Sequence, residues 1–452
     1  MIPAVKTFEN IRKSYGLKTA FRAVSCKLRG VPVSTVLPPP PLPELNAEDV
    51  IVQPEVKVKP EYFTFYEEWL EKHSKKLEEC VAPSFLSSKL TIAIIADLNL
   101  PQCKKYRVLQ KFEAFKNAGY NVSFCHWLDQ PRAFNIMQCA THYIFYRIPD
   151  CEIFDSYIRE SRRLGGISFY DIDDPIFDSR VYGLNKGLDF ISQEEKKSLL
   201  NLAPSYGKAI AKCDVSIAST PGIKALMEVI SGKPVILWRN LVDVQTRQAA
   251  DLALEQRASR AESKFSVDNE ALTLGYMSGS RAHEADFREA SDDIALIMEK
   301  FPKIKFKVVG HLILPDVLEP FQERIEMIPF SDYPSYIRHL SEVDINLLPL
   351  TPNDFNECKS AIRYLEASMV NVPSIVTKVG DFKYVAQENR TVLFVDDENS
   401  WYRQIDTLIR NNTLRNKLTK AANDDVNTRF LLDLIPKSVA SHFSIRGYNK
   451  LS

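Results

Sequence analysis

The chain has 452 residues, which is too many for one ordinary hydrophobic core and suits two domains with additions. Its 45% hydrophobic and 26% charged residues are typical of a soluble globular protein, and 58 basic residues balance 58 acidic ones, so no overall charge attracts it to nucleic acid. Its 8 Cys form no CxxC pair or His/Cys cluster, which argues against a structural zinc site or a disulfide framework and favours a reducing cytoplasm.

Residues 1–88 are predicted to be an extension ahead of the folded domains. Residues 1–35 carry many basic residues against the single acidic Glu9, which suits an amphipathic helix on an anionic membrane, or a helix that packs on the folded domains. A Pro-rich linker at 36–46 and a helix of mixed charge at 58–80 follow. No apolar run approaches the roughly 20 residues of a membrane span, and a signal peptide is not expected.

The first folded domain is predicted at residues 89–243. It opens with a buried strand at 90–99, a helix that ends at Gly119 and a second strand, which is the order of a Rossmann-like domain. Because this opening contains no GxGxxG, we expect no NAD or FAD site there. The later strands are predicted within residues 141–150, 167–177, 210–219 and 233–243.

Three carboxylates, Asp171, Asp173 and Asp174, gather at the carboxyl end of the strand that begins near residue 167. Carboxylates this close repel one another, so the cluster predicts a cation, a hydrogen-bond network or a role in proton handling. Capping of the next turn is the simpler alternative.

A charged helical connection at 244–270 leads to the second domain at 271–428, and residues 429–452 are expected to cross back onto the first. The second domain opens with a strand, the small-residue turn 278–280 and a helix. In this arrangement free backbone N–H groups close on a phosphate.

Basic side chains follow this turn at Arg281 and His283, with Asp286 as a partner that orients His283. An ordinary surface His is the alternative for His283. Gly310 ends a later strand, at a point where a base or a ribose can approach the backbone.

Residues 344–377 predict a strand, a polar loop, a helix and a second strand, which is a unit of a parallel sheet. Asn356 is predicted to cap a helix over about 357–369. Lys359 and Glu366 would lie about 20° apart around that helix, so a phosphate near Lys359 and sugar hydroxyls near Glu366 fit one face. Exposed side chains on an ordinary amphipathic helix are the alternative. The residues predicted to face the core are Cys358, Ile362, Leu365 and Met369.

The run of residues 348–377 resembles the nucleotide-sugar half of GT-B glycosyltransferases of the large retaining family usually numbered four. Glu366 matches the second Glu of the family motif, which holds the nucleotide ribose. The first Glu falls on Cys358, and Glu357 is one position off register, so the catalytic part of the motif is altered. A subgroup often found in surface-polysaccharide synthesis shares three residues of this loop, Asn356, Lys359 and Ser360.

The resemblance covers about residues 89–430 and implies an α/β fold of two Rossmann-like domains with a cleft between them. The loop after the first strand then faces the cleft, so Tyr106 and Arg107 are expected to contact the acceptor; a solvated Arg107 is the alternative. Residues 240–243 resemble the hinge between the domains. Asp171 and Asp173 form a D-x-D, which ligates a metal in GT-A enzymes. GT-B enzymes generally work without that metal, and the resemblance therefore favours an acceptor-side or interdomain role for Asp173 and Asp174.

Together, the residue patterns and the resemblance predict a catalytic set of Lys359, Glu357, Asp173 and Asp174. The predicted donor-binding set comprises Ser278, Gly279, Ser280, Arg281, His283, Gly310, Asn356, Ser360, Glu366, Gly380 and Asp381. Two of these, Gly380 and Asp381, occupy the place of a Gly-Gly-Glu that many members of the family carry near the donor sugar.

The function that these residues imply is transfer of a sugar from a nucleotide-diphosphate sugar to a hydroxyl of a glycan or lipid-linked acceptor, with retention, in polysaccharide or glycoconjugate synthesis. We expect no metal or other cofactor, no nucleic-acid partner, and a cytoplasmic protein that can lie on the inner face of the membrane. A catalytically inactive scaffold or sugar-nucleotide-binding subunit is one alternative, because of Cys358 and the missing Gly-Gly-Glu. A sugar-nucleotide-modifying enzyme such as an epimerase is another.

Overall fold

The computed structural model describes residues 90–263, 272–279 and 284–435, all of which belong to one compact unit, Glu78–Ser452. The predictions for the extension at 1–88, and for the chain beyond 435, lie outside this range. None of the helices in the described ranges is long and apolar enough to cross a membrane.

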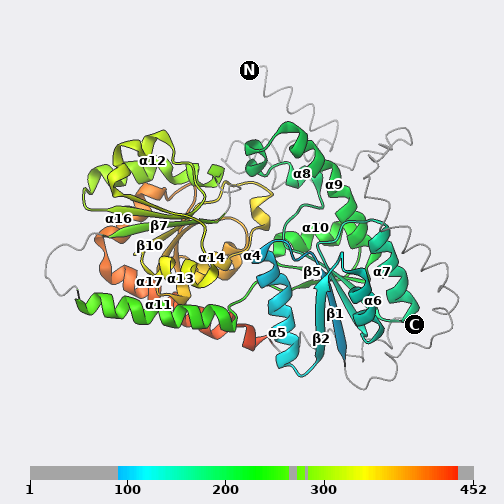
Figure 1. Ribbon diagram of the computed structural model, residues 1–452. Helices are drawn as coiled ribbons and strands as arrows, with labels where there is room; N and C mark the ends of the chain where they lie inside the picture. Colours follow the sequence, from blue (N-terminus) through cyan, green and yellow to red (C-terminus); the bar gives the residue numbers. More distant parts are fainter. Residues whose placement is uncertain (1–89, 264–271, 280–283, 436–452) are drawn as a thin grey trace, which may run out of the picture. The chain divides into compact units, whose positions relative to one another are not determined.

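Two parallel sheets of six strands each form the framework (Figure 1). Their order is β2-β1-β3-β4-β5-β6 in the first sheet and β12-β11-β10-β7-β8-β9 in the second. The strands of the first sheet are β1 (Thr91–Ala96), β2 (Asn121–His126), β3 (His142–Tyr146), β4 (Ile167–Ile172), β5 (Val215–Ala218) and β6 (Val235–Leu237). Those of the second are β7 (Thr273–Gly279), β8 (Lys305–Gly310), β9 (Ile325–Ile328), β10 (Ile345–Leu348), β11 (Ser374–Thr377) and β12 (Val392–Val395).

Helices cover both faces of each sheet. Those between the strands of the first sheet are α4 (Pro101–Cys103), the π-helical turn η4 (Lys104–Leu109), α5 (Gln110–Asn117), α6 (Gln130–Gln138), α7 (Glu152–Arg163), α8 (Ser179–Tyr182), η5 (Lys186–Phe190), α9 (Gln193–Lys212) and α10 (Pro221–Ser231). Those that follow are α11 (Val244–Ser263), α12 (Glu284–Lys300), η7 (Asp316–Arg324), α13 (Tyr333–Ser341), η8 (Asn356–Cys358), α14 (Ile362–Met369), α15 (Phe382–Val385), α16 (Trp401–Arg410), α17 (Asn412–Arg429) and η9 (Leu432–Leu434). The predicted α/β class with two Rossmann-like sheets is confirmed.

The alternation of side chains along the strands divides each core into two layers. In β1, Ala93 and Ile95 pack with α6, α7 and α10, whereas Ile92 and Ile94 face α5. In the second domain, α12 and α16 cover one face of the sheet, and α11, α13, α14 and α17 cover the other (Figure 1). Strands that are buried on both faces need near-continuous apolar runs, which is why these segments were recognisable in the sequence.

Both sheets reverse their strand order at an internal point, between β1 and β3 in the first and between β7 and β10 in the second. In open parallel sheets, ligands bind at the carboxyl ends of the strands beside such a point. The paired register of β1, β3 and β4 brings the loops after Ala96, Tyr146 and Ile172 to one edge.

The two domains are joined twice. Helix α11 occupies most of the segment in which a helical connection was predicted, and it packs on α13. After α17 the chain returns to the hinge, where the amide of Val242 donates to Phe430 and that of Leu432 donates to Val242, at 2.9 and 2.8 Å. Ile435 then packs against the core of the first domain.

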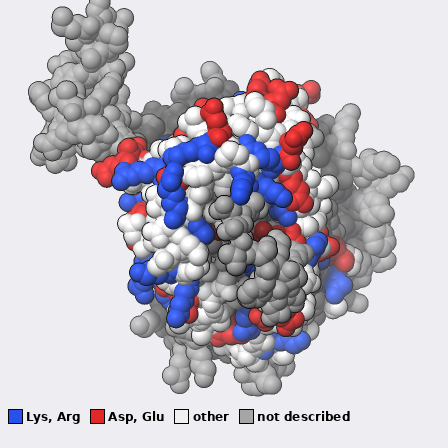
Figure 2. All heavy atoms as spheres, turned by 90° about the vertical axis from the view of Figure 1, so that its left-hand side faces the viewer, with Lys and Arg blue, Asp and Glu red and all other residues white. Residues whose placement is uncertain are grey.

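Charged side chains of both signs are interspersed over the face of the molecule drawn in Figure 2.

Candidate functional site

The carboxyl ends of β3 and β4 present a cluster of charged groups. Asp173 accepts a hydrogen bond from the Tyr146 hydroxyl at 2.8 Å, and a guanidinium nitrogen of Arg147 lies 3.7 Å from Asp173 and 3.9 Å from Asp174. Burial and the nearby Asp174 raise the pKa of Asp173, and Arg147 opposes this rise. The predicted repulsion between the carboxylates is thus met by a cation and a hydrogen bond.

Asp171 is separated from this cluster because its side chain points into the core. It pairs with Arg107 at 2.6 Å and with Lys111 at 2.5 Å, and all three side chains are fully buried. A D-x-D metal site would need Asp171 beside Asp173 in the cleft, so this arrangement does not suit one. Among the described residues, no three His, Cys, Asp or Glu side chains are grouped as metal ligands.

The position of Arg107 contradicts both its predicted contact with the acceptor and the alternative of a solvated side chain. The side chain is completely buried, and besides Asp171 it donates to the Trp238 carbonyl at 2.8 Å and to Asn240 at 2.9 Å. Arg107 therefore ties the first helix to β4 and to the hinge. Its side-chain partners lie 64 or more residues away in the sequence, so the periodicity of the helix could not predict them.

The loop before α14 differs from the predicted helix of about 357–369. Residues 356–358 form the short turn η8, Lys359 is extended with φ −74° and ψ 139°, and α14 starts at Ile362. Asn356 is not a helix cap: its buried amide donates to Asp286 at 2.8 Å and to the Thr351 carbonyl at 2.9 Å. A contact between Asp286 and His283 lies outside the described residues.

Close backbone packing explains this shape. A Cβ on Gly222 of α10 would lie 2.5 Å from the Glu357 carbonyl oxygen, and one on Gly380 would lie 2.7 Å from the Asn356 carbonyl oxygen. Gly380 also has φ +65°, which favours glycine. The loop is held between the N-terminus of α10 and the segment after β11, and this tertiary packing overrides the local helical signal.

Cys358 faces a core, as predicted, but it is the core of the first domain. It is 2% exposed, and Thr220 of α10 donates a hydrogen bond to its carbonyl at 3.0 Å. Burial raises the pKa of its thiol to about 12, so Cys358 stays protonated at neutral pH. The neighbouring Glu357 pairs with Lys383 at 2.5 Å and accepts from the Gly380 amide at 3.2 Å.

Lys359 links the two domains. Its ammonium group lies 2.8 Å from an Asp174 oxygen and 4.4 Å from the centre of the Phe355 ring. The structure thus brings Lys359, Asp173 and Asp174 together, with Arg147 beside them. Lys359 precedes α14, so the prediction that it shares a helix face with Glu366 is wrong.

Glu366 is buried on α14, where three tyrosine hydroxyls surround its carboxylate. Tyr333 and Tyr336 donate to it at 2.9 Å each, and Tyr106 of the first domain also donates to it. Burial raises the pKa of Glu366, and the three hydroxyls oppose that rise. Tyr106 therefore faces the second domain's Glu366.

The other predicted donor residues are spread over the carboxyl edge of the second sheet. Gly310 ends β8 with φ +105° and pairs in register with Gly279 at the end of β7, next to Ser278. Asp381 is 2% exposed and pairs with Arg239 of the first domain at 3.0 Å. The Ser360 hydroxyl lies 3.4 Å from the Asn240 amide nitrogen. The residues that fall outside the described ranges are Ser280, Arg281 and His283.

Sequence reasoning missed several residues of this region. Arg147 directly follows β3, as Asp173 follows β4, and it has the left-handed φ of +54° that is uncommon outside glycine. The rule that site residues follow the carboxyl ends of parallel strands could have found it. No local pattern marks Arg239, Tyr333 or Tyr336.

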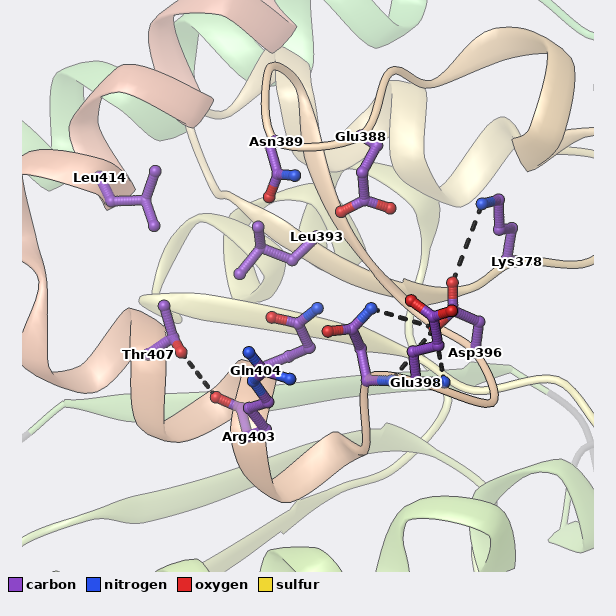
Figure 3. Close-up of a pocket in the computed structure, with 11 residues that line it drawn as sticks. Lys378, Glu388, Asn389, Leu393, Asp396, Glu398, Arg403, Gln404, Thr407 and Leu414 are labelled. Atoms are coloured by element: carbon purple, nitrogen blue, oxygen red, sulfur yellow. Dashed lines mark hydrogen bonds and ion pairs between the residues drawn. The ribbon is translucent and has the colours of Figure 1, made fainter.

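A separate polar hollow of about 440 Å³ lies beyond the ends of β11 and β12 (Figure 3). Lys378 and Asp396 face each other there, 3.8 Å apart. None of the predicted site residues lines it.

A family model described as Glycosyl transferase-like matches residues 288–433 of this chain. Solved glycosyltransferases with two Rossmann-like domains have the same fold over most of the chain. The chain therefore has the GT-B fold, and residues 288–433 of its second domain are similar to a glycosyl transferase-like family. The family-four subtype and the roles of single residues stay predictions.

Three solved structures document this similarity. A glycosyltransferase from Rickettsia africae aligns with TM-score 0.58 and 12% identity over 81% of this GT-B chain and 100% of its own. Sucrose-phosphate synthase from Thermosynechococcus elongatus aligns with TM-score 0.54 and 12% identity over 80% of this chain and 100% of its own. HepE from Anabaena, in complex with UDP, aligns with TM-score 0.51 and 11% identity over 78% of this chain and 99% of its own. No curated protein matches the chain in a sequence search.

Replacing Arg107 tests its structural role. We expect Arg107→Ala to lower the free energy of unfolding by about 3 kcal/mol or more, because it breaks a buried ion pair and removes two buried hydrogen bonds of the guanidinium group. Arg180→Ala is the control: this side chain is 47% exposed and pairs with Asp178, so its loss should cost less than about 1 kcal/mol. Urea denaturation of both variants measures the difference, and equally small losses would contradict the assignment.

Alkylation tests the state of Cys358. With iodoacetamide at pH 8, we expect the exposed Cys139 to react in the native protein and Cys358 to react only after denaturation, because burial holds the pKa of its thiol at about 12. Peptide mass spectrometry measures both sites. Native labelling of Cys358 at the rate of Cys139 would show that the thiol is accessible.

Proposed function

We propose that this GT-B protein transfers a sugar from a nucleotide-diphosphate sugar to a hydroxyl of a glycan or lipid-linked acceptor, with retention. The observation that carries the proposal is the meeting of Lys359 from the second domain with Asp174 from the first, 2.8 Å apart. A cation beside the donor domain's loop can neutralise the departing diphosphate, and a carboxylate on the opposite domain can bind the acceptor hydroxyl.

Lys359 is assigned to the leaving diphosphate. During transfer the bond between the anomeric carbon and the diphosphate oxygen breaks, and negative charge grows on that oxygen. Lys359 would exchange Asp174 for the phosphates, and the backbone at the end of β7 and the N-terminus of α12 would add N–H groups. Preorganised charges of this kind lower the barrier by several kcal/mol, and the scheme assigns no step to a metal.

Asp173 and Asp174 are assigned to the acceptor. Once Lys359 turns to the diphosphate, an Asp174 oxygen can accept a hydrogen bond from the acceptor hydroxyl and orient it. For retention, the acceptor oxygen bonds to the anomeric carbon on the face that the diphosphate leaves, and the hydroxyl proton passes to the departing diphosphate oxygen. Arg147 keeps the two carboxylates in place from the first domain. Glu366 is assigned to the ribose of the nucleotide, following the family motif.

The uridine nucleotides are the first donors to test, because HepE, which shares the fold, has been crystallised with UDP and with UDP-glucose. An inactive sugar-nucleotide-binding subunit is the second candidate. It is favoured by Cys358, which is buried in the first domain's core where the family carries a Glu, and by Glu357, which is paired with Lys383.

Substitution of Lys359 separates these candidates. Removing one preorganised contact to developing charge typically costs about 2.7–4 kcal/mol, so we expect Lys359→Ala to lower kcat about a hundredfold or more. Stability should change by less than about 1 kcal/mol, because the pair with Asp174 is partly exposed. Lys224→Ala, which removes an exposed lysine of α10, is the control and should keep full activity.

The measurement is sugar transfer from a panel of nucleotide sugars, together with the shift of the thermal midpoint by the matching nucleoside diphosphates. Normal turnover in Lys359→Ala would refute the catalytic assignment. Stabilisation by a nucleotide without transfer to any acceptor would establish the binding subunit instead.

A further inference from the structure

The carboxylate of Glu366 is held by three tyrosines that the family motif does not contain. It is 2% exposed, and both of its oxygens accept hydroxyl donors: Tyr333 and Tyr106 donate to one, and Tyr336 donates to the other. A buried carboxylate is tolerated only when hydrogen bonds replace its lost hydration. Among the described residues, these three tyrosines are the hydrogen-bond donors to Glu366.

The three donors do not come from the same part of the molecule. Tyr333 and Tyr336 lie on α13 in the domain of Glu366, and their rings are stacked with centroids 6.0 Å apart. Tyr106 lies on the π-helical turn η4 of the first domain. Two hydroxyls therefore stay with Glu366 whatever the domains do, whereas the third can leave when they move.

The residue beside Tyr106 is anchored at the hinge. Lys105 pairs with Asp243 at 2.6 Å, and its ammonium group lies 4.2 Å from the centre of the Tyr333 ring. Asp243 accepts from the Thr246 hydroxyl, which in turn lies 2.8 Å from the Tyr333 hydroxyl. The contact between Tyr106 and Glu366 is thus part of a buried network that includes the hinge.

We propose that Tyr106 occupies the place of the ribose hydroxyls on Glu366, so that a nucleotide binds only when Tyr106 releases this carboxylate, and that Tyr336 is a positioning residue that orients Glu366 for the ribose. The inference rests on the assignment of Glu366 to the ribose under the proposed function. One oxygen of Glu366 already accepts two hydroxyls, and the side chain is almost inaccessible, so a ribose diol cannot be added without displacing a donor.

Tyr106 is the donor that leaves. Tyr336 belongs to the same domain as Glu366, and Tyr333 is also held by Thr246. The hydroxyl of Tyr106 has Glu366 as its close partner, with Tyr333 at 3.5 Å. When Tyr106 leaves, the Glu366 oxygen that accepted from both Tyr106 and Tyr333 keeps only Tyr333 as a donor, and it can then accept a ribose hydroxyl.

Two matched substitutions test this inference, because each removes one hydroxyl from the same carboxylate. We expect Tyr106→Phe to bind UDP roughly three- to tenfold more tightly than the wild type, since the competing hydrogen bond is gone, and Tyr336→Phe to bind UDP more weakly by a similar factor. Tyr120→Phe, directly before β2 and at the opposite end of α5 from Tyr106, is the control and should bind like the wild type. Isothermal titration calorimetry on the full chain measures the dissociation constants.

The ribose gives a second readout. The increase in affinity that Tyr106→Phe gives for UDP should be smaller for 2′-deoxy-UDP, which lacks one of the hydroxyls that would replace Tyr106. A general loosening of the protein would change the affinity for both nucleotides alike. Thermal midpoints without ligand show that the variants fold.

The outcomes separate the inference from the proposed function. If UDP binds the wild type and Tyr106→Phe with equal affinity, or binds the variant more weakly, the role of Tyr106 is refuted and the proposed function stands. If neither protein binds UDP or any other nucleoside diphosphate, both are refuted. Opposite shifts in Tyr106→Phe and Tyr336→Phe support both.

Discussion

The backbone of residues 356–359 is pressed between two glycines, and the rest of the site depends on this contact. Gly222 at the start of α10 and Gly380 after β11 leave no room for a side chain against it. The predicted α-helix does not form there: the short 3-10 turn η8 ends at Cys358, and the extended Lys359 reaches Asp174 of the first domain. The same contact puts Cys358 into the first domain's core and leaves Glu357 at the other side of the loop, with Lys383.

Ionic groups between the domains are paired across the boundary. Lys359 meets Asp174, Arg239 meets Asp381, and Tyr106 meets Glu366. A charge buried without a partner costs several kcal/mol, so Arg239 and Tyr106 stabilise the buried carboxylates of Asp381 and Glu366 in the described arrangement of the domains. The pair of Lys359 with Asp174 is partly exposed and contributes less. An anionic nucleotide would compete for the same groups. Under the proposed function, the free energy of nucleotide binding is then reduced by what these existing partners give up.

The altered family motif has a structural explanation in this GT-B protein. The position of the first Glu is filled by a thiol among apolar side chains, where an ionised carboxylate would lose its hydration without gaining a partner. The second Glu is present, and it is surrounded by hydroxyls that can exchange with those of a ribose.

What the sequence by itself determined was the framework. Apolar runs flanked by polar loops identified the strands, because a strand buried on both faces must be apolar along its length. The carboxyl ends of those strands located Asp173 and Asp174, and the family motif located Glu366. What only the tertiary structure decided were the partners: Asp171 for Arg107, Asp174 for Lys359 and Tyr106 for Glu366. The start of α14 and the hydrogen bonds of Asn356 were also decided only by the tertiary structure. Periodicity reports which face of an element is apolar, but the free energy of a buried charge or a crowded loop depends on groups that only folding brings near.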